Sequence, residues 1–289
     1  MKRLFFPILT LLLAVLLGTL ASQRTPMPIV RGDILNDNQR TTQPSSNRLR
    51  VGTYNIHSGK GHDEGTSPEA IAEVLGNPPL DIIGLQEVTG HLADGGNQAS
   101  DLAGMLELGW LYAPTRNKPF TADFGSALLS RFPVQAYEFT PLLHERRTAS
   151  STDVSRAHRN IISVTLDIQN TPVKVFITHL DRGPLRLAQL QDVINTFKQH
   201  PHAILMGDLN SRHDDAPLQT LLAGGEASDA IAATADDENI NKRIDWILTR
   251  GFNIIEGGSH PRGVSDHPQF WVELQLDTTA ADSSGPSAP

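Results

Sequence analysis

The sequence predicts a mixed α/β (α+β) sandwich, built from many short strands and a few helices. A series of short apolar runs has the length and the β-branched content of strands. These runs cover residues 48–55, 81–85, 126–129, 161–168, 173–178, 203–206, 244–248 and 270–276. Because helical patterns do not fall between every pair of runs, the chain lacks the strict strand–helix alternation of a parallel α/β fold.

Helix signals are clear in two segments of the sequence. Ser67 is a suitable N-cap, Pro68 fits the first helical position, and apolar residues continue to Leu75. The second helix follows Pro184, where apolar side chains recur at helical spacing at Leu187, Leu190, Ile194 and Phe197. Both segments therefore present one apolar face, as helices that cover a sheet do.

The ends of the chain lack the pattern of a globular domain. Lys2 and Arg3 precede an apolar run that extends to Leu20, which is the form of a signal peptide or an N-terminal membrane anchor. We therefore expect export to the periplasm or the extracellular space, or retention at the membrane. The chain divides into this leader, a flexible linker, one folded domain and a disordered tail: residues 1–22, 23–47, 48–276 and 277–289.

Composition limits which metal ligands and which charged partners the chain can have. The sequence has no cysteine, which excludes disulfides and thiolate ligands. A bound metal would need oxygen or imidazole ligands, which favour magnesium, manganese or calcium over structural zinc. The formal net charge of −8 argues against indiscriminate binding to DNA or anionic lipid. The one basic concentration, residues 144–159, is either a solvated loop or a loop that faces a phosphate.

Polar side chains follow or interrupt most of the apolar runs. A strand directs successive side chains to opposite faces, so a polar residue at its end leaves the core at an edge of the sheet. A single residue of this kind is usually a turn former, but here carboxylate, amide and imidazole groups recur at the ends of several apolar runs. We therefore expect one polar site at a shared edge. Its candidate residues are Asn55, Glu87, His179, Asp208, Asn210, Asp245, Asp266 and His267.

At these positions the sequence resembles the endonuclease/exonuclease/phosphatase superfamily, which includes deoxyribonuclease I, neutral sphingomyelinases and inositol-phosphate phosphatases. The resemblance implies a four-layer αββα sandwich of the deoxyribonuclease I type, with residues 48–276 as a catalytic domain that hydrolyses phosphoester bonds. The matching segments occur in the family order: Thr53-Tyr-Asn-Ile-His, Leu85-Gln-Glu-Val, Thr178-His-Leu, Gly207-Asp-Leu-Asn, Arg243-Ile-Asp-Trp and Ser265-Asp-His-Pro. Each segment is short, but together they are specific.

The resemblance also implies a divalent metal ion. Glu87 would bind the ion, with Asn55 and Asp266 beside it. Oxygen ligands suit a hard ion, so Mg²⁺ is expected, with Mn²⁺ or Ca²⁺ as alternatives. The ion would neutralise charge on the transferring phosphoryl group.

The other candidates would carry out proton transfer and phosphate binding. By resemblance, Asp208 and Asn210 orient or deprotonate the attacking water, and His267 acts as acid/base or holds the scissile phosphate. Asp245 would fix the tautomer of His267 and favour its charged form. A covalent mechanism is not expected, because no convincing nucleophilic serine accompanies these residues. Two further side chains would face the phosphate: Arg159 and His179.

The substrate stays open between a nucleic acid and a phospholipid or small phosphoester. His179 is typical of the deoxyribonuclease I, sphingomyelinase and phosphatase branches and counts against a role in abasic-site repair. A nuclease would need a basic groove, for which the region 146–159 qualifies. A phospholipid enzyme would need an exposed apolar loop, but its candidate residues are interpreted as ordinary core: Trp110, Tyr112, Phe120 and Phe124. A third hypothesis, a membrane-tethered binding protein without catalysis, conflicts with the complete set of site residues. We expect a monomer.

Overall fold

The computed structural model describes residues 47–277 apart from short gaps, together with residues 11, 13–14 and 31–32. The gaps are residues 63–65, 93–94, 117–121, 148–153 and 237–238, and only the backbone is described for residues 143–147 and 154–158. Most of the predicted leader, linker and tail, as well as Phe120, therefore lie outside the described residues. Within the described part, no helix is long and apolar enough to cross a membrane.

One sheet has seven strands, of which β2 and β3 run parallel to each other. In spatial order the strands are β1 (Arg31–Gly32), β4 (Gly109–Arg116), β5 (Phe124–Ser130), β3 (Ile82–Thr89), β2 (Arg48–Asn55), β13 (Gln269–Leu276) and β12 (Phe252–His260). The strands predicted at 48–55, 81–85, 126–129 and 270–276 are confirmed as members of this sheet. β12 escapes prediction because glycines and polar residues interrupt its apolar pattern.

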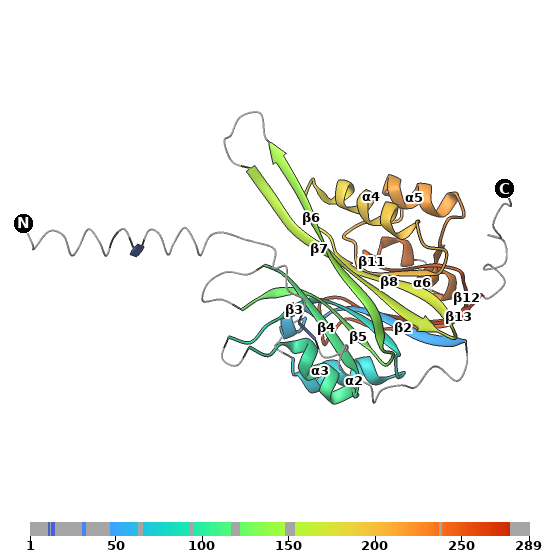
Figure 1. Cartoon of the computed structure of the whole chain (residues 1–289), viewed down its shortest axis with the longest axis horizontal. Coiled ribbons are helices and arrows are strands. Elements are labelled where there is room, and N and C mark those ends of the chain that lie inside the picture. The colour runs from blue at the N-terminus through green and yellow to red at the C-terminus, as the bar shows by residue number, and fades with distance from the viewer. Residues whose placement is uncertain are drawn as a thin grey trace, which may run out of the picture.

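The other sheet has six strands, with β8 and β9 as its parallel pair. The order is β10 (Ser228–Asp229), β11 (Asp245–Arg250), β9 (Ala203–Asp208), β8 (Thr171–His179), β7 (Val154–Ile168) and β6 (Val134–Arg147). β6 and β7 form a long hairpin that extends beyond the sandwich (Figure 1). The basic region 144–159, predicted to be a loop, therefore belongs mostly to two paired strands, and that prediction is wrong. A hairpin arm outside the core needs no apolar alternation, so the pattern did not reveal it.

Helices cover the outer faces of both sheets and complete four layers (Figure 1). They are α2 (Pro68–Gly76) and α3 (Gln98–Leu106) on the seven-stranded sheet, and α4 (Arg186–Phe197) and α5 (Ala216–Ala223) on the six-stranded sheet. The loops carry three shorter elements: α6 (Ala230–Thr234), η2 (His57–Gly59) and η3 (Ile240–Lys242). The predicted αββα sandwich is confirmed.

Strand alternation sorts the buried side chains into separate layers. In β9, Ile204 and Met206 pack between the two sheets, whereas Leu205 packs against the helices on the outer face. Val51 of β2 and Val175 of β8 extend the inter-sheet cluster. Burying each such side chain contributes roughly 1.5–3 kcal/mol. A one-residue slip would turn these residues outward, so the core fixes the register of every strand that reaches the polar edge.

The predicted helix starts agree with the structure. Ser67 Oγ accepts a hydrogen bond from the Ala70 N–H at 3.2 Å, and Pro68 opens α2. α4 begins at Arg186 and buries three of its predicted apolar residues: Leu190, Ile194 and Phe197. Leu187, predicted on the same face, is exposed instead.

The segment before β2 also contributes to the sheet. Arg31 lies opposite Tyr112, and Gly32 lies opposite Leu111, so two residues of the predicted linker extend the sheet beyond β4. A Cβ on Gly32 would approach the Trp110 carbonyl oxygen to 2.3 Å, which leaves room only for glycine. Tyr112 is fully buried and Trp110 is half-buried, as the core interpretation of these aromatic residues predicts.

Candidate active site

The inter-sheet face of several strands becomes polar at one edge of the sandwich. β9 ends in Asp208, which continues the row of apolar side chains that pack between the sheets. Its register partners are His179 at the end of β8 and Asp245 at the start of β11. Asn55 occupies the same position at the end of β2 in the facing sheet. The alternation that builds the core therefore delivers all four side chains to one place.

Glu87 reaches this edge through a backbone irregularity. Ile83 and Leu85 of β3 pack toward the helices, and strict alternation would direct Glu87 the same way. Instead, the register shifts between Leu85 and Val88, and Glu87 has a φ of 59°. This β-bulge turns the side chain so that Oε1 accepts a hydrogen bond from Asn55 Nδ2 at 3.3 Å.

Asn55 is buried at the centre of the cluster and joins its two sides. Its Nδ2 donates to Asp208 Oδ2 at 3.1 Å and to Glu87 Oε1 at 3.3 Å, and it lies 3.4 Å from His267 Nε2. Its Oδ1 accepts from the backbone N–H of His57 at 3.1 Å. That last bond decides which end of the amide faces the carboxylates, so Asn55 presents its NH₂ group to the cluster.

His267 lies between β12 and β13 and is held through both its ring and its backbone. Nδ1 lies 2.8 Å from Asp245 Oδ2. The backbone N–H donates to Ser265 Oγ at 3.4 Å, and Ser265 Oγ donates to the carbonyl oxygen of Asn55 at 2.6 Å. With Nδ1 bound to a carboxylate, Nε2 is the ring atom that faces the cluster.

Asp208 and His267 form an electrostatic pair, with Nε2 3.7 Å from Oδ2. Burial alone would lower the pKa of His267, but the hydrogen bond to Asp245 and the neighbouring negative charges outweigh it and raise the pKa to about 9. Burial, reinforced by the charge of Asp245, raises the pKa of Asp208 to about 7, although hydrogen bonds from the Asn210 N–H and Asn55 oppose the rise. At neutral pH the pair therefore holds a proton on His267 and is poised to exchange one at Asp208.

Two further residues lie near the cluster, His179 on β8 and Arg159 on β7. His179 is buried, its Nε2 lies 3.4 Å from Asp208 Oδ2, and neither ring nitrogen has a hydrogen-bond partner among the described residues. Burial, followed by the charge of Arg159, holds the pKa of His179 well below its usual range, so the ring is neutral. Burial also lowers the pKa of Arg159, while the charges of Asp181, Asp208 and Glu87 act against that shift. The guanidinium therefore lies near the carboxylates of the cluster.

Asn210 supports Asp208 from the loop after β9. Its backbone N–H donates to Asp208 Oδ1 at 2.9 Å, and its side-chain Nδ2 donates to the Leu180 carbonyl oxygen at 2.9 Å. The residue has a φ of 48°, a conformation that asparagine tolerates better than most residues. With Oδ1 occupied by this bond, Oδ2 of Asp208 is the oxygen that faces the cluster.

The sequence was compared with known families, and residues 52–267 match the Endonuclease/Exonuclease/phosphatase family. This segment covers most of the chain and includes every residue of the cluster. The chain belongs to the endonuclease/exonuclease/phosphatase family. As a member of it, the chain is an enzyme that hydrolyses phosphoester bonds.

Solved structures of this family share the fold. An endonuclease/exonuclease/phosphatase from Beutenbergia cavernae is 21% identical, with a TM-score of 0.61 over 79% of this chain and 72% of that one. The catalytic domain of human Nocturnin, solved with a bound sulfate anion, is 17% identical, with a TM-score of 0.62 over 80% and 95%. A mannosyl-6-phosphatase from Bacteroides thetaiotaomicron is 18% identical, with a TM-score of 0.60 over 78% and 99%. The comparison with curated protein sequences gave no significant match.

The cluster has the donor set of a divalent-metal site, as is typical of the family. Asp208, Asp245 and His267 offer ligand atoms that all lie within 4.8 Å of one another. Asp245 Oδ1 is buried and has no hydrogen-bond partner among the described residues, which leaves an oxygen available to a cation. Glu87 adds a carboxylate at the same Asn55 Nδ2, and Asp266, directly before His267 in sequence, adds a partly exposed one. Carboxylate oxygens fit a hard divalent ion. The ligand roles of Glu87, Asn55 and Asp266 stay predictions.

His57 is a site residue to which the sequence assigned no role, although it ends a motif that carries the family resemblance. Its Nδ1 lies 3.5 Å from Asp266 Oδ1 and 3.0 Å from the Gly61 carbonyl oxygen. Both neighbours are acceptors, so Nδ1 carries the proton. Asp266 is one-third exposed, with 33% of its side chain accessible, and Ser265 Oγ lies 3.4 Å from the same Oδ1. His57 and Ser265 thus hold Asp266 at the open side of the cluster.

Proposed function

We propose that the chain is a divalent-metal-dependent phosphodiesterase of the nuclease type that acts outside the cytoplasm. The observation that supports this most directly is the buried contact of Asn55 Nδ2 with Glu87, Asp208 and His267. It gathers a base, an acid and metal-binding carboxylates around one point. In-line hydrolysis of a phosphoester needs these groups together.

Asp208 is the base that activates the attacking water. A pKa of about 7 is near the value at which a carboxylate both stays ionised and accepts a proton readily. The water oxygen attacks phosphorus, and the water proton passes to Asp208 Oδ2. The Asn210 N–H, 2.9 Å from Oδ1, holds the carboxylate so that Oδ2 faces the reaction.

His267 is the acid that protonates the leaving oxygen. Its Nδ1–H is bound to Asp245 at 2.8 Å, so the proton on Nε2 is the one available to the substrate. When the bond between phosphorus and the leaving oxygen breaks, this proton passes to that oxygen. The proton gained by Asp208 then restores His267, directly or through solvent, and the cycle balances.

His179 and Arg159 bind the phosphoryl oxygens. The ring nitrogens of His179 have no hydrogen-bond partner among the described residues, so its N–H is available to a phosphate. Arg159 brings a positive charge to the same side of the cluster. When bound, the divalent ion, which we take to be Mg²⁺, neutralises charge on the transferring group. Glu87 and Asp266 would hold the ion.

One observation supports export, and another counts against a phospholipid enzyme. The basic and then apolar start of the sequence, from Lys2 to Leu20, supports export. The aromatic residues considered for a lipid-binding loop include Tyr112, which is buried in the sheet. A phospholipid or small-molecule phosphoester hydrolase remains the alternative, and a membrane-tethered binding protein without catalysis is disfavoured by the intact cluster.

The test is nicking of supercoiled plasmid DNA by the purified full-length chain with Mg²⁺ and with chelator. We expect chelator to abolish nicking and His267→Ala to lower turnover by roughly 10²-fold or more. His260→Ala, which removes a histidine of the same hairpin outside the cluster, is the matched control and should keep full activity. Chelator-resistant nicking, or an active His267→Ala variant, would contradict the mechanism. A folded protein that cleaves only small phosphodiesters would move the substrate to the alternative class.

A further inference from the structure

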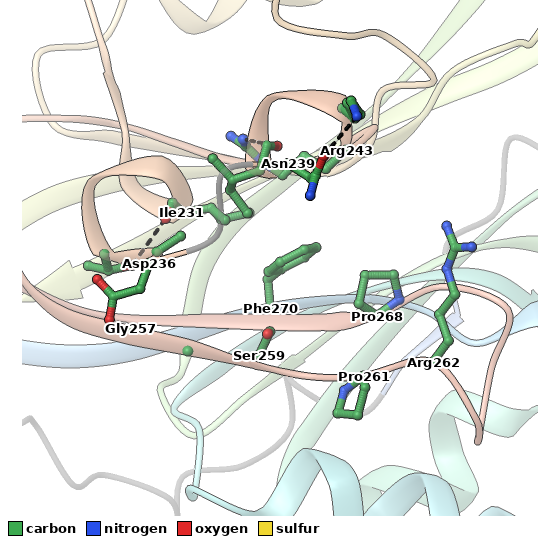
Figure 2. Close-up of a pocket in the computed structure, with 15 residues that line it drawn as sticks. Ile231, Asp236, Asn239, Arg243, Gly257, Ser259, Pro261, Arg262, Pro268 and Phe270 are labelled. Carbon is green, nitrogen blue, oxygen red and sulfur yellow. Dashed lines mark hydrogen bonds between the residues drawn. The ribbon is translucent and has the colours of Figure 1, made fainter.

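A cavity of about 600 Å³ lies beside the catalytic cluster. It opens between the β12–β13 hairpin and the segment that carries α6 and η3 (Figure 2). Pro268, which lines the cavity, directly follows His267, and Arg243, which also lines it, stands two residues before Asp245. Consecutive Cα atoms are about 3.8 Å apart. The cavity and the catalytic histidine therefore share a wall.

The floor of the cavity is apolar. Ile231 of α6 and Phe270 of β13 belong to the inter-sheet core, and Ile240 of η3 packs against it. Pro268 adds a ring beside Phe270 (Figure 2). Ser259 lies opposite Phe270 in the register of the hairpin, so both side chains project to the same face. Ring faces and aliphatic side chains at this size suit a compact, flat guest.

Polar side chains surround the opening. Asp236, Asn239, Lys242 and Arg262 all line the cavity and are exposed, with Asp236 and Arg262 at opposite ends of it in Figure 2. Lys242 Nζ donates to Asn239 Oδ1 at 2.7 Å, which orders the amide at the rim. The rim thus places hydrogen-bonding groups around an apolar floor, with cations at Lys242 and Arg262.

One wall of the cavity is rigid because Arg243 is held from three directions. Its Nη2 contacts both carboxylate oxygens of Asp229, and its Nη1 donates to the Ile240 carbonyl oxygen at 2.9 Å. It also lies 4.2 Å from the centre of the Trp246 ring. Since Ile240 forms part of the floor, this wall and the adjoining part of the floor are preformed. A preformed site binds its ligand with a smaller ordering cost.

We propose that this cavity binds the nucleobase of a nucleotide whose phosphate occupies the catalytic cluster. The inference rests on the proposed function and narrows its substrate to nucleotide phosphoesters. A base has apolar faces, which match Phe270 and Pro268, and polar edges, which match Ser259 and Asn239. An acyl chain would match the floor but gain nothing from the rim, so the cavity favours a nucleotide over a phospholipid.

The experiment compares the binding of adenosine 5′-monophosphate and ribose 5-phosphate, which differ only in the base. Calorimetry on the full-length chain in chelator measures both dissociation constants without turnover. Stacking of a base on aromatic side chains is worth about 1–3 kcal/mol, so we expect adenosine 5′-monophosphate to bind about 10- to 100-fold more tightly. Equal affinity for the two compounds would overturn the proposal.

Variants locate the preference in the cavity. Ser259→Trp fills the space opposite Phe270 and should bring the two affinities to within about twofold of each other. Asn253→Trp, at an exposed position of the same strand that does not line the cavity, should keep the preference. Asn239→Ala removes one polar group of the rim, perturbs the core least, and should reduce the preference by a few-fold. A full preference retained by Ser259→Trp would overturn the assignment.

Two further measurements separate this proposal from its alternatives. Binding of octyl phosphate that is lost in Ser259→Trp, with adenosine 5′-monophosphate unaffected, would assign the cavity to an acyl chain and overturn the nucleobase proposal. Hydrolysis of methyl p-nitrophenyl phosphate, which has no base, reports on the proposed function alone. A chain with the base preference but with neither this hydrolysis nor plasmid nicking would refute the function, and one with the hydrolysis but without the preference would refute the subsite.

Discussion

Strand β2 has a polar cluster at each of its ends, one around Arg50 and one around Asn55. At the start of the strand, Arg48 and Arg50 pair with Glu273 at 3.2 and 2.9 Å, and Arg50 also approaches Glu256 at 3.5 Å. The Arg50 side chain is 37% exposed, so water screens these ion pairs. At the end of the strand, Asn55 has no exposed surface. The two clusters share a strand and differ in solvent access.

The clusters also differ in how completely their charged and polar groups are paired. Around Arg50 the charged side chains form ion pairs with side chains of opposite charge. Around Asn55, two carboxylates are neighbours in the register, Asp208 and Asp245, and the ring nitrogens of His179 have no hydrogen-bond partner among the described residues. Such groups destabilise a fold when buried. Burial without full pairing, rather than polarity at a strand end, therefore distinguishes the candidate catalytic site from the ion-pair cluster around Arg50.

The variant expected to show this difference most strongly is Asp208→Asn, which should lower turnover by roughly 10²- to 10⁴-fold while it raises stability. Burial raises the pKa of Asp208 in the folded chain from 3.8 to about 7. Because the pKa of Asp208 is higher in the folded chain than in the unfolded chain, the contribution of this group to stability is fully present below pH 4 and is lost as pH rises through about 7. The amide side chain of the Asp208→Asn variant does not ionise, so the variant does not lose this contribution as pH rises. In chelator, the free energy of unfolding of the variant minus that of wild type should therefore increase from pH 4 to pH 8, by up to about 4 kcal/mol. Melting temperatures measured across this pH range check the trend.

Asp81→Asn is the matched control in the other cluster. Asp81 pairs with Arg131 at 3.0 Å and accepts a hydrogen bond from the Arg50 N–H at 2.9 Å. This substitution should leave turnover unchanged and lower stability slightly. A stability difference for Asp208→Asn that stays flat or falls with pH would show that burial does not disfavour its charge.

Strand alternation made part of the site predictable from sequence. The apolar runs that end in Asn55, His179 and Asp208 require those side chains to continue the buried face of their strands, and the structure places them there. Alternation within a strand carries no information about which strands face each other. The family motifs supplied that part, because they tie the residues of both sheets to one edge.

Backbone irregularities and short elements made the rest unpredictable. Glu87 reaches the cluster only because a bulge with a φ of 59° turns it away from the helices, whereas a regular strand pattern points it outward. His57, with a φ of 48°, is oriented by a turn that leaves no periodic pattern in the sequence. α3 begins with a capping box formed by Asn97 and Ser100. The sequence signature of a capping box has Glu or Gln at the position of Ser100, so this helix start was not recognised. The cavity depends on α6, η3 and β12, none of which has a periodic apolar pattern.

The next largest effect should come from Glu87→Gln, which we expect to raise the Mg²⁺ concentration for half-maximal hydrolysis by about 10-fold or more. The amide oxygen can still accept the hydrogen bond from Asn55 Nδ2, so the fold and the cluster geometry are retained. Only the charge offered to the ion is lost. Glu273→Gln removes a charge at the opposite end of the strands and should leave the Mg²⁺ titration unchanged. An unchanged titration for Glu87→Gln would remove that residue from the ligand set.

A smaller effect is expected from His57→Ala, which should raise the Mg²⁺ concentration for half-maximal hydrolysis by a few-fold to about 10-fold. The imidazole positions Asp266 across 3.5 Å, while the bond that orients Asn55 comes from the His57 backbone and survives the change. His57→Asn keeps a side-chain donor and tolerates the positive φ, so it should recover part of the loss. Equal Mg²⁺ titrations for wild type and His57→Ala would show that Asp266 does not depend on this histidine.

The smallest effect is expected at the other end of β2. Arg50→Ala breaks an exposed ion pair with Glu256 and a partly buried one with Glu273, and should cost about 0–1 kcal/mol of stability. Turnover and the Mg²⁺ titration should match wild type, because the residue lies at the opposite end of the strand from Asn55. Urea unfolding and steady-state hydrolysis measure the two quantities. A clear fall in turnover at unchanged stability would mean that the ends of β2 are coupled, and that exposed, fully paired charges contribute to the catalytic edge after all.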